Sequence, residues 1–139
     1  MQKMSAPELT FCDFSHLAQD VPAPAETQRG KFVQLLHQEQ GEIIVFAPLS
    51  VCSFHAQIVM LYCNTQNPPW SFEINDRGDD GTLQEVAVQI VGGGYFDHFI
   101  DKRRLCLSGS SKAYGSYNPI GLPEKLLGLE RFQSYKIIC

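Results

Sequence analysis

The chain has 139 residues, the usual length of one domain. Hydrophobic residues make up 44% and charged residues 19% of it, which is typical of a globular protein and excludes wholesale disorder. The 11 basic residues against 15 acidic ones give a formal net charge of −4, which argues against a general nucleic-acid binder because such surfaces need a surplus of Lys and Arg.

Residues 1–30 are predicted to form a loose N-terminal arm and linker. Polar residues are scattered through this stretch, and prolines interrupt it at three positions (Pro7, Pro22 and Pro24), a composition that disfavours regular structure. One apolar cluster, Leu9 to Phe14, is able to dock on the rest of the chain. We therefore expect an arm that ends at Gly30 and a single domain over residues 31–139.

Two strands are expected at the start of the domain. Apolar residues between Lys31 and Leu36 favour the first strand, and Glu42–Ala47 is a second β-rich run that Pro48 ends. The next apolar stretch, Val51–Tyr62, satisfies neither the strand period nor the helix period cleanly. It stays open between a strand and a helix.

The second half of the domain contains the clearest pattern, a β-hairpin. Leu83–Val91 alternates in part and runs into Gly92-Gly93-Gly94, and Tyr95–Ile100 then leads through a charged turn into Arg104–Leu107. Three further elements are expected: a turn, a short helix with proline in its first turn, and a last strand (Asp76–Gly81, Pro123–Leu129 and Tyr135–Cys139). The predicted fold class is α+β with more strand than helix.

Membrane and secretory segments are not expected. No apolar run approaches the roughly 20 residues that a membrane helix needs, and Met1–Ser5 lacks the apolar region of a secretory signal. The 5 cysteines are an odd number at irregular spacing and include no CxxC pair. Reduced thiols in a cytoplasmic protein are the expectation.

The loop Ser108–Gly115 is chemically suggestive. Its small residues allow a tight fold in which successive N–H groups converge on an anion, helped by hydroxyls and by Lys112. An ordinary exposed turn has the same composition, so both interpretations stay open. The loop matches no Walker pattern. A serine-hydrolase site is excluded because all four histidines precede Ser111, whereas the nucleophile elbow needs its histidine later in the chain.

His55 is the candidate acid–base residue. It lies at the edge of an apolar run, where a partly buried histidine without chemistry is equally compatible with the sequence. The functional interpretation uses imidazole as base or nucleophile, since its pKa of about 6.5 suits both tasks at neutral pH. Cys52 and Cys63 flank His55, but no second paired motif supports a metal site. His98 is expected to be solvated or to lie across from a neighbouring strand.

These segments together resemble the Janus/Ocnus family of small phosphohistidine phosphatases. The resemblance runs over roughly residues 31–139, in the order Lys31-Phe32-Val33, Glu42-Ile43-Ile44, Phe54-His55-Ala56, Gly92-Gly93-Gly94 and Ser111-Lys112-Ala113-Tyr114-Gly115. It implies a small mixed β-sheet with about two helices packed on it. It also implies a metal-independent and cofactor-free phosphatase that removes phosphate from histidine or lysine side chains by P–N bond hydrolysis.

The resemblance also implies roles for single residues. His55 would be the catalytic imidazole, acting as base or nucleophile, and Lys31 would help to hold the phosphoryl group. The phosphate oxygens would be bound by backbone and hydroxyl groups close to these two (Ala56, Ser111, Lys112 and Ala113). The expected partner is a phosphorylated protein or a small phosphoramidate.

The sequence departs from the family pattern at three places. The arginine that follows the triple glycine in the family is Tyr95 here. A second family arginine, which precedes the catalytic histidine, has no counterpart in this sequence, and its place falls near Ala47. The stretch between the catalytic histidine and the glycines is longer and contains Asn67-Pro68-Pro69-Trp70. An alternative is therefore a non-catalytic member of the fold that binds an anion, or a protein through an anchor at Trp70. A structural homo-oligomer that uses an exposed edge strand is a third hypothesis.

Overall fold

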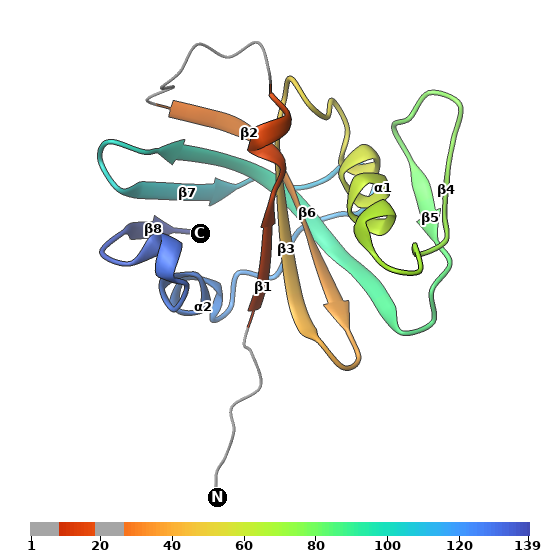
Figure 1. Ribbon diagram of the computed structural model, residues 1–139. Coiled ribbons are helices and arrows are strands. Elements are labelled where there is room, and N and C mark those ends of the chain that lie inside the picture. The colour runs from red at the N-terminus through yellow and green to blue at the C-terminus, as the bar shows by residue number, and fades with distance from the viewer. Residues whose placement is uncertain (1–8, 19–26) are drawn as a thin grey trace, which may run out of the picture.

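A curled sheet of six strands forms the centre of the computed structural model, which describes residues 9–18 and 27–139 (Figure 1). The strand order is β1-β3-β2-β6-β7-β8. Their bounds are Leu9–Asp13 (β1), Thr27–His37 (β2), Gly41–Pro48 (β3), Val88–Phe99 (β6), Arg104–Ser108 (β7) and Lys136–Ile138 (β8). The four central strands pair antiparallel, whereas β1 pairs parallel with β3 and β8 pairs parallel with β7.

Two helices and a small second sheet complete the fold. The helices are α1 (His55–Thr65) and α2 (Leu122–Leu127), and the second sheet pairs β4 (Phe72–Ile74) with β5 (Gly81–Leu83). Two 3-10 turns, η1 (Phe14–Leu17) and η2 (Glu130–Phe132), follow β1 and α2. The α+β class is confirmed. Among the described residues no helix is long and apolar enough to cross a membrane.

The position of strand β3 between two cores explains why its sequence is an unbroken apolar run. Successive strand residues point to opposite faces, and here both faces are covered. Ile43 and Val45 pack in the core beneath α1, whereas Ile44 and Phe46 pack in a second core beneath α2. A strand buried on both faces loses the polar alternation of a half-exposed one.

The sheet begins earlier than the predicted boundary at residue 31. Leu9–Asp13 forms the edge strand β1, and β2 starts at Thr27, so the part of the expected arm that the structure describes belongs to the domain. The cause is apolar burial, because Leu9 and Phe14 are both buried in the cores. Gly30 lies inside β2, where a Cβ would come within 2.7 Å of the Phe96 ring. The three prolines of the arm lie outside the described residues.

Elements left open by the sequence are settled by packing. The ambiguous stretch Val51–Tyr62 contains the start of α1, whose buried residues include Ile58 and Val59. The triple glycine does not interrupt β6, which runs continuously from Val88 to Phe99. The expected hairpin between β6 and β7 is confirmed. The predicted short helix is α2, with Pro123 in its first turn.

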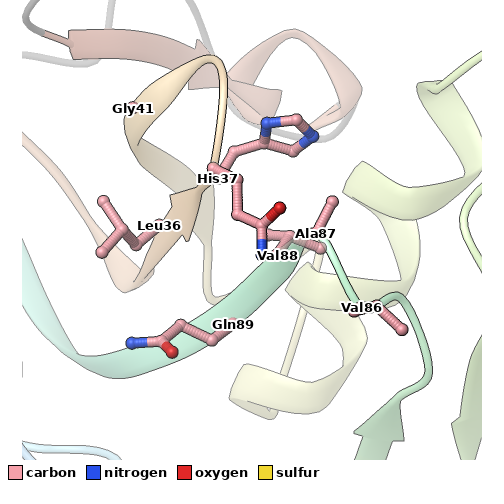
Figure 2. A pocket seen from close by; sticks show the side chains of 8 residues that line it. Leu36, His37, Gly41, Val86, Ala87, Val88 and Gln89 are labelled. Atoms are coloured by element: carbon pink, nitrogen blue, oxygen red, sulfur yellow. The ribbon is translucent and has the colours of Figure 1, made fainter.

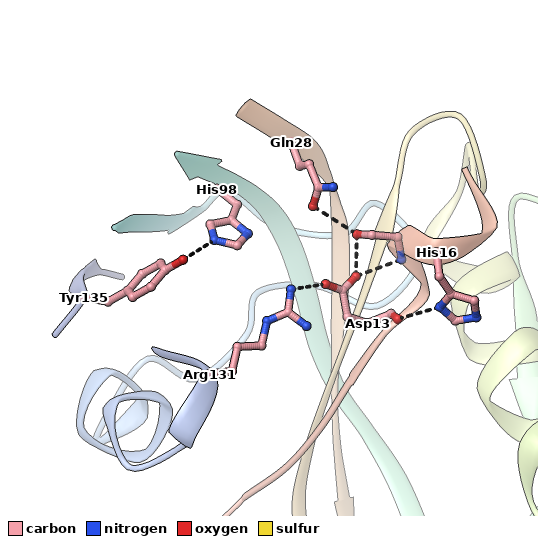
Figure 3. A network of polar contacts seen from close by, with 7 residues as sticks. Asp13, His16, Gln28, His98, Arg131 and Tyr135 are labelled. Carbon is pink, nitrogen blue, oxygen red and sulfur yellow. Dashed lines mark hydrogen bonds and ion pairs between the residues drawn. The ribbon is translucent and has the colours of Figure 1, made fainter. Parts of the chain in front are cut away.

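A polar network connects β1 and η1 to η2, which lies near the other end of the described chain (Figure 3). The Asp13 carboxylate accepts a hydrogen bond from the Ser15 amide at 2.9 Å and pairs with the Arg131 guanidinium at 2.6 Å. Close by, the His98 Nε2 and the Tyr135 hydroxyl are hydrogen-bonded at 2.8 Å. His98 is only 4% exposed, so the expectation of a solvated residue is wrong, whereas the alternative is confirmed because His98 lies across from Gln28 of β2 and Leu105 of β7. Its ring is enclosed because Phe132 and Tyr135 pack against it.

Gln34 holds the loop between β7 and α2 against the sheet. Its side chain is 3% exposed. The Gln34 amide group donates to the Asn118 carbonyl at 3.0 Å, and its oxygen accepts from the Asn118 N–H at 2.7 Å. Its Nε2 also donates to the Glu42 carboxylate, which pairs with Lys125 of α2 at 2.7 Å. One buried amide therefore connects β2, β3 and the segment that leads into α2.

Replacing Gln34 with Leu should destabilise the protein by about 1–3 kcal/mol, because the partners of a buried hydrogen-bonding group lose their bonds. The free energy of unfolding, measured by urea denaturation, gives this value. Gln89→Leu is the matched control, since Gln89 is an exposed residue of β6 and surface changes usually stay within about 0.5 kcal/mol. Equal stability of the two variants would contradict the role of Gln34 in holding the loop against the sheet.

Stability should fall on acidification, and His98 should account for part of the loss. Burial lowers the pKa of His98 below its ordinary value of 6.5, the Arg131 charge lowers it further, and the Asp13 charge opposes both. The unfolded chain therefore binds the proton first. The contribution is complete above pH 6.5 and is lost as the pH falls through the folded pKa, at no more than about 1.4 kcal/mol per pH unit.

The measurement is urea unfolding at several pH values between 7.5 and 5.0 for the wild type and for His98→Gln. We expect a shallower loss of unfolding free energy in the variant. Identical slopes in the two proteins would show that His98 does not titrate differently in the folded and unfolded states.

Candidate functional site

His55 is placed by the start of helix α1. The helix begins there because the preceding backbone is capped: Gln57 Oε1 accepts hydrogen bonds from the Ser53 N–H at 2.8 Å and from the Phe54 N–H at 3.3 Å. This is the reciprocal half of a capping box. His55 thus occupies the first helical position and is 5% exposed.

The imidazole of His55 is held against the glycine segment of β6. Its Nε2 lies 2.9 Å from the Gly94 carbonyl oxygen. A carbonyl only accepts, so Nε2 carries the proton and the neutral ring keeps the Nδ1 lone pair available. The glycines permit this approach, since a Cβ at Gly93 would come 2.8 Å from His55 Cδ2 and 2.6 Å from the Phe32 carbonyl. Gly93 is therefore a packing requirement of this site.

The pKa of His55 is lowered from its ordinary value. Burial is the largest cause, the bond to the Gly94 carbonyl opposes it, and the positive charge of Lys31 lowers the pKa further. The ring is consequently neutral at pH 7. A neutral imidazole with a free lone pair is a competent base or nucleophile.

Lys31 lies close enough to His55 for its charge to lower the pKa of the ring. Its ammonium donates to the Ser53 carbonyl at 2.5 Å, immediately before α1. In the sheet Lys31 is paired with Ala47 of β3 on one side and with Tyr95 of β6 on the other. Paired residues of neighbouring strands point to the same face. The two positions where the family pattern has arginine therefore flank Lys31, and Lys31 is the cation of this row.

The turn Ser111–Gly115 meets the same region through Gly93. The Gly93 N–H donates to the Gly115 carbonyl at 3.1 Å, which places the turn against the glycines that accommodate His55. Ser111 is buried, and its Oγ accepts from the Tyr114 N–H at 3.1 Å. The Ser111 N–H and carbonyl both bond to Gly115 within the turn.

These internal bonds alter the expected anion nest. The amides of Ser111, Tyr114 and Gly115 are occupied by the turn itself. Among the described residues, the amides of Lys112 and Ala113 have no such partner, and the Ser111 hydroxyl keeps a proton to donate. The turn can therefore offer these three groups to an anion, which means fewer amides than the sequence predicted.

Lys112 is exposed, and its charge affects Asp79 in the turn between β4 and β5. The side-chain bond from Asn75 lowers the pKa of Asp79, and the charges of Arg77 and Lys112 lower it further. The Tyr114 hydroxyl donates to the Gly81 carbonyl at 2.9 Å and so docks this hairpin on the Ser111–Gly115 turn. The longer stretch between His55 and the glycines thus forms the β4–β5 hairpin, which packs against the Ser111–Gly115 turn.

Trp70, the residue expected to serve as an anchor in the protein-binding alternative, packs partly against the domain. Trp70 is half-buried, stacks on His37 with ring centroids 5.6 Å apart, and meets Tyr62 edge-to-face at 5.7 Å. The nearby pocket of about 350 Å³ is lined by the ends of β2 and β6 and by Val86 (Figure 2). His37 follows Lys31 by six strand residues, which is roughly 20 Å, so this pocket is separate from His55.

Metal ligation finds no support in the described part of the chain. No group of three or more His, Cys, Asp or Glu residues is placed to hold a metal ion there. The thiols that flank His55 in the sequence are free and buried, and burial raises the pKa of Cys52 and of Cys63 to about 11. Both thiols are therefore protonated at neutral pH.

Ala56 follows His55 in the first turn of α1, and its side chain is fully buried. Only its backbone N–H is in a position to act, as one of the amides that lack an intrahelical partner at a helix start.

A scan of the chain against protein-family models finds no match, and a search of the curated proteins finds none. The candidate site therefore rests on its geometry, which joins Lys31, His55 and the Ser111–Gly115 turn around Gly93.

Removing the charge of Lys31 should raise the pKa of His55, because that charge disfavours the protonated ring. We expect Lys31→Gln to move the His55 titration toward higher pH in an NMR pH titration of the ring protons. Lys112→Gln is the control, since the Lys112 charge is not a cause of the His55 shift. An unchanged titration in Lys31→Gln would show that the two groups do not interact.

Proposed function

We propose that this protein is a metal-independent phosphatase that hydrolyses the P–N bond of phosphohistidine or phospholysine, with His55 as base or nucleophile. The observation that carries the proposal is the neutral, buried imidazole fixed by Gly94 with a lysine ammonium beside it. The six-stranded sheet with a helix on each face supports the wider proposal of a phosphohistidine-phosphatase-like fold.

The start of α1 supplies the anion-binding part of this mechanism. Its first amides, those of His55 and Ala56, are unpaired within the helix and lie at the positive end of the helix dipole. This arrangement favours a phosphoryl group. Lys31 adds a point charge, and Ser111, Lys112 and Ala113 add the hydroxyl and amides of their turn. Because no arginine flanks Lys31, the phosphoryl group loses a bidentate partner and depends more on these amides.

His55 Nδ1 supplies the reactive lone pair. As a base it takes a proton from water, whose oxygen attacks phosphorus while the P–N bond breaks, and the proton passes to the leaving nitrogen. As a nucleophile, Nδ1 forms a bond to phosphorus while the substrate P–N bond breaks and the leaving nitrogen takes a proton from water. A second water molecule then breaks the Nδ1–P bond, which releases phosphate and restores the neutral imidazole. Either route needs the neutral ring, and positioning with electrostatic stabilisation supplies the rest because the P–N bond is labile.

A second candidate function is non-catalytic anion binding on the same site. One observation favours it: Ala47 and Tyr95 occupy the row where the family pattern has arginine, so cations expected for catalysis are missing while Lys31 remains to hold an anion. The free thiols of the described residues support the further proposal of a cytoplasmic setting.

His55→Ala should abolish phosphate release from phosphohistidine and phospholysine, because it removes the lone pair while leaving the helix start intact. Release is measured with EDTA present, for the wild type, for His55→Ala and for the exposed control His16→Ala. We expect turnover in the wild type and in the control and a loss of at least about 100-fold in His55→Ala.

Inactivity of the wild type together with retained phosphate binding would favour the anion-binding function. Equal turnover in the wild type and in His55→Ala would overturn the role of His55.

A further inference from the structure

Two exposed aromatic rings flank the ammonium of Lys31. Phe54 is 39% exposed and Tyr95 is 43% exposed. The Lys31 Nζ lies 5.5 Å from the centroid of the Phe54 ring and 5.7 Å from that of Tyr95. Large exposed aromatic side chains are costly to leave in water, and here two of them border a single cation next to His55.

The Tyr95 ring is held in place on several sides. It meets the His55 ring edge-to-face at 5.8 Å with an interplanar angle of 77°. On another side it rests on Gly109, where a Cβ would come 2.7 Å from Tyr95 Cδ2. Gly109 has a φ of +75°, which glycine adopts without strain. The ring is therefore positioned before any ligand arrives, which lowers the entropy cost of binding.

We propose that Phe54 and Tyr95 form a subsite for the planar ring of a substrate whose phosphoryl group pairs with Lys31. An anion bound to Lys31 brings the organic group that carries it next to these two rings. A planar ring can then stack or meet them edge-to-face, whereas an alkyl chain gains burial alone. The proposal rests on the proposed function and narrows its substrate class, because it favours phosphohistidine, which has a ring, over phospholysine.

The subsite can be tested by binding, without turnover. The probes are phenylphosphonate and butylphosphonate, which carry the same anionic group on a ring and on a chain, and their dissociation constants are measured by NMR titration. We expect the wild type to prefer phenylphosphonate by about 3- to 10-fold, from the size of aromatic pair interactions. Tyr95→Phe should keep this preference, and Tyr95→Leu should reduce it to less than about 2-fold.

Phe54→Leu is the second variant and guards against misfolding of Tyr95→Leu. Phe54 makes no side-chain capping bond that this change would remove, so the variant should fold and lose part of the ring preference. Val86→Ala is the control, because Val86 is exposed and lines the separate pocket.

Equal affinities of the two probes in the wild type, no binding of either, or a preference that survives both leucine variants would overturn the subsite. Failure of the proposed function gives a different result: phenylphosphonate binds preferentially while phosphohistidine is not hydrolysed. Conversely, turnover that depends on His55 with no ring preference would overturn the subsite alone.

Discussion

The contact between His55, at the start of helix α1, and the glycines of strand β6 is the constraint on which the site depends. Gly93 lacks the side chain that would push His55 away from the strand, because a Cβ there would meet both the His55 ring and the backbone of β2. The gap that remains is filled by the imidazole, whose Nε2 bonds to the Gly94 carbonyl. This contact sets the tautomer of His55, while burial of the ring lowers its pKa against the opposing effect of the Gly94 bond.

Burial on both faces of the sheet explains how that contact is maintained. Strand β3 contributes residues to the core beneath α1 and to the core beneath α2. Close-packed cores yield little to strain, so the strands cannot shift without disturbing both layers. Lys31 is set into the same frame by its register with Ala47 and Tyr95. The register thus fixes the backbone from which the candidate cation reaches the site.

The sequence predicted those parts of the fold that depend on local pattern. The apolar run of β3, the hairpin from β6 to β7 and the proline at the start of α2 are local signals, and the structure confirms them. Strand β1 was missed because its partner β3 lies some thirty residues later, and parallel pairing across such a distance has no local signature. The stretch from Val51 remained ambiguous because its period is mixed and tertiary packing decides its state.

The same distinction applies to the site. His55, Lys31 and the Ser111–Gly115 turn were named from the sequence, and the structure brings them together around Gly93. Their partners were not predictable, because the carbonyls of Ser53 and Gly94 belong to the backbone and leave no residue-type signal. The exposed rings of Phe54 and Tyr95 were missed because exposure of an aromatic residue is a property of the folded chain.

The mixed pairing of the sheet has a consequence for how the chain opens. The two hairpins, β2 with β3 and β6 with β7, are joined by the long antiparallel pairing of β2 with β6 at the centre. The outer strands β1 and β8 are short, pair on one edge only and are attached in parallel. Edge elements with few neighbours open at lower free energy than a central ladder. Backbone amides of β1 and β8 therefore exchange with solvent through local opening while the central hairpins, and His55 with them, remain folded.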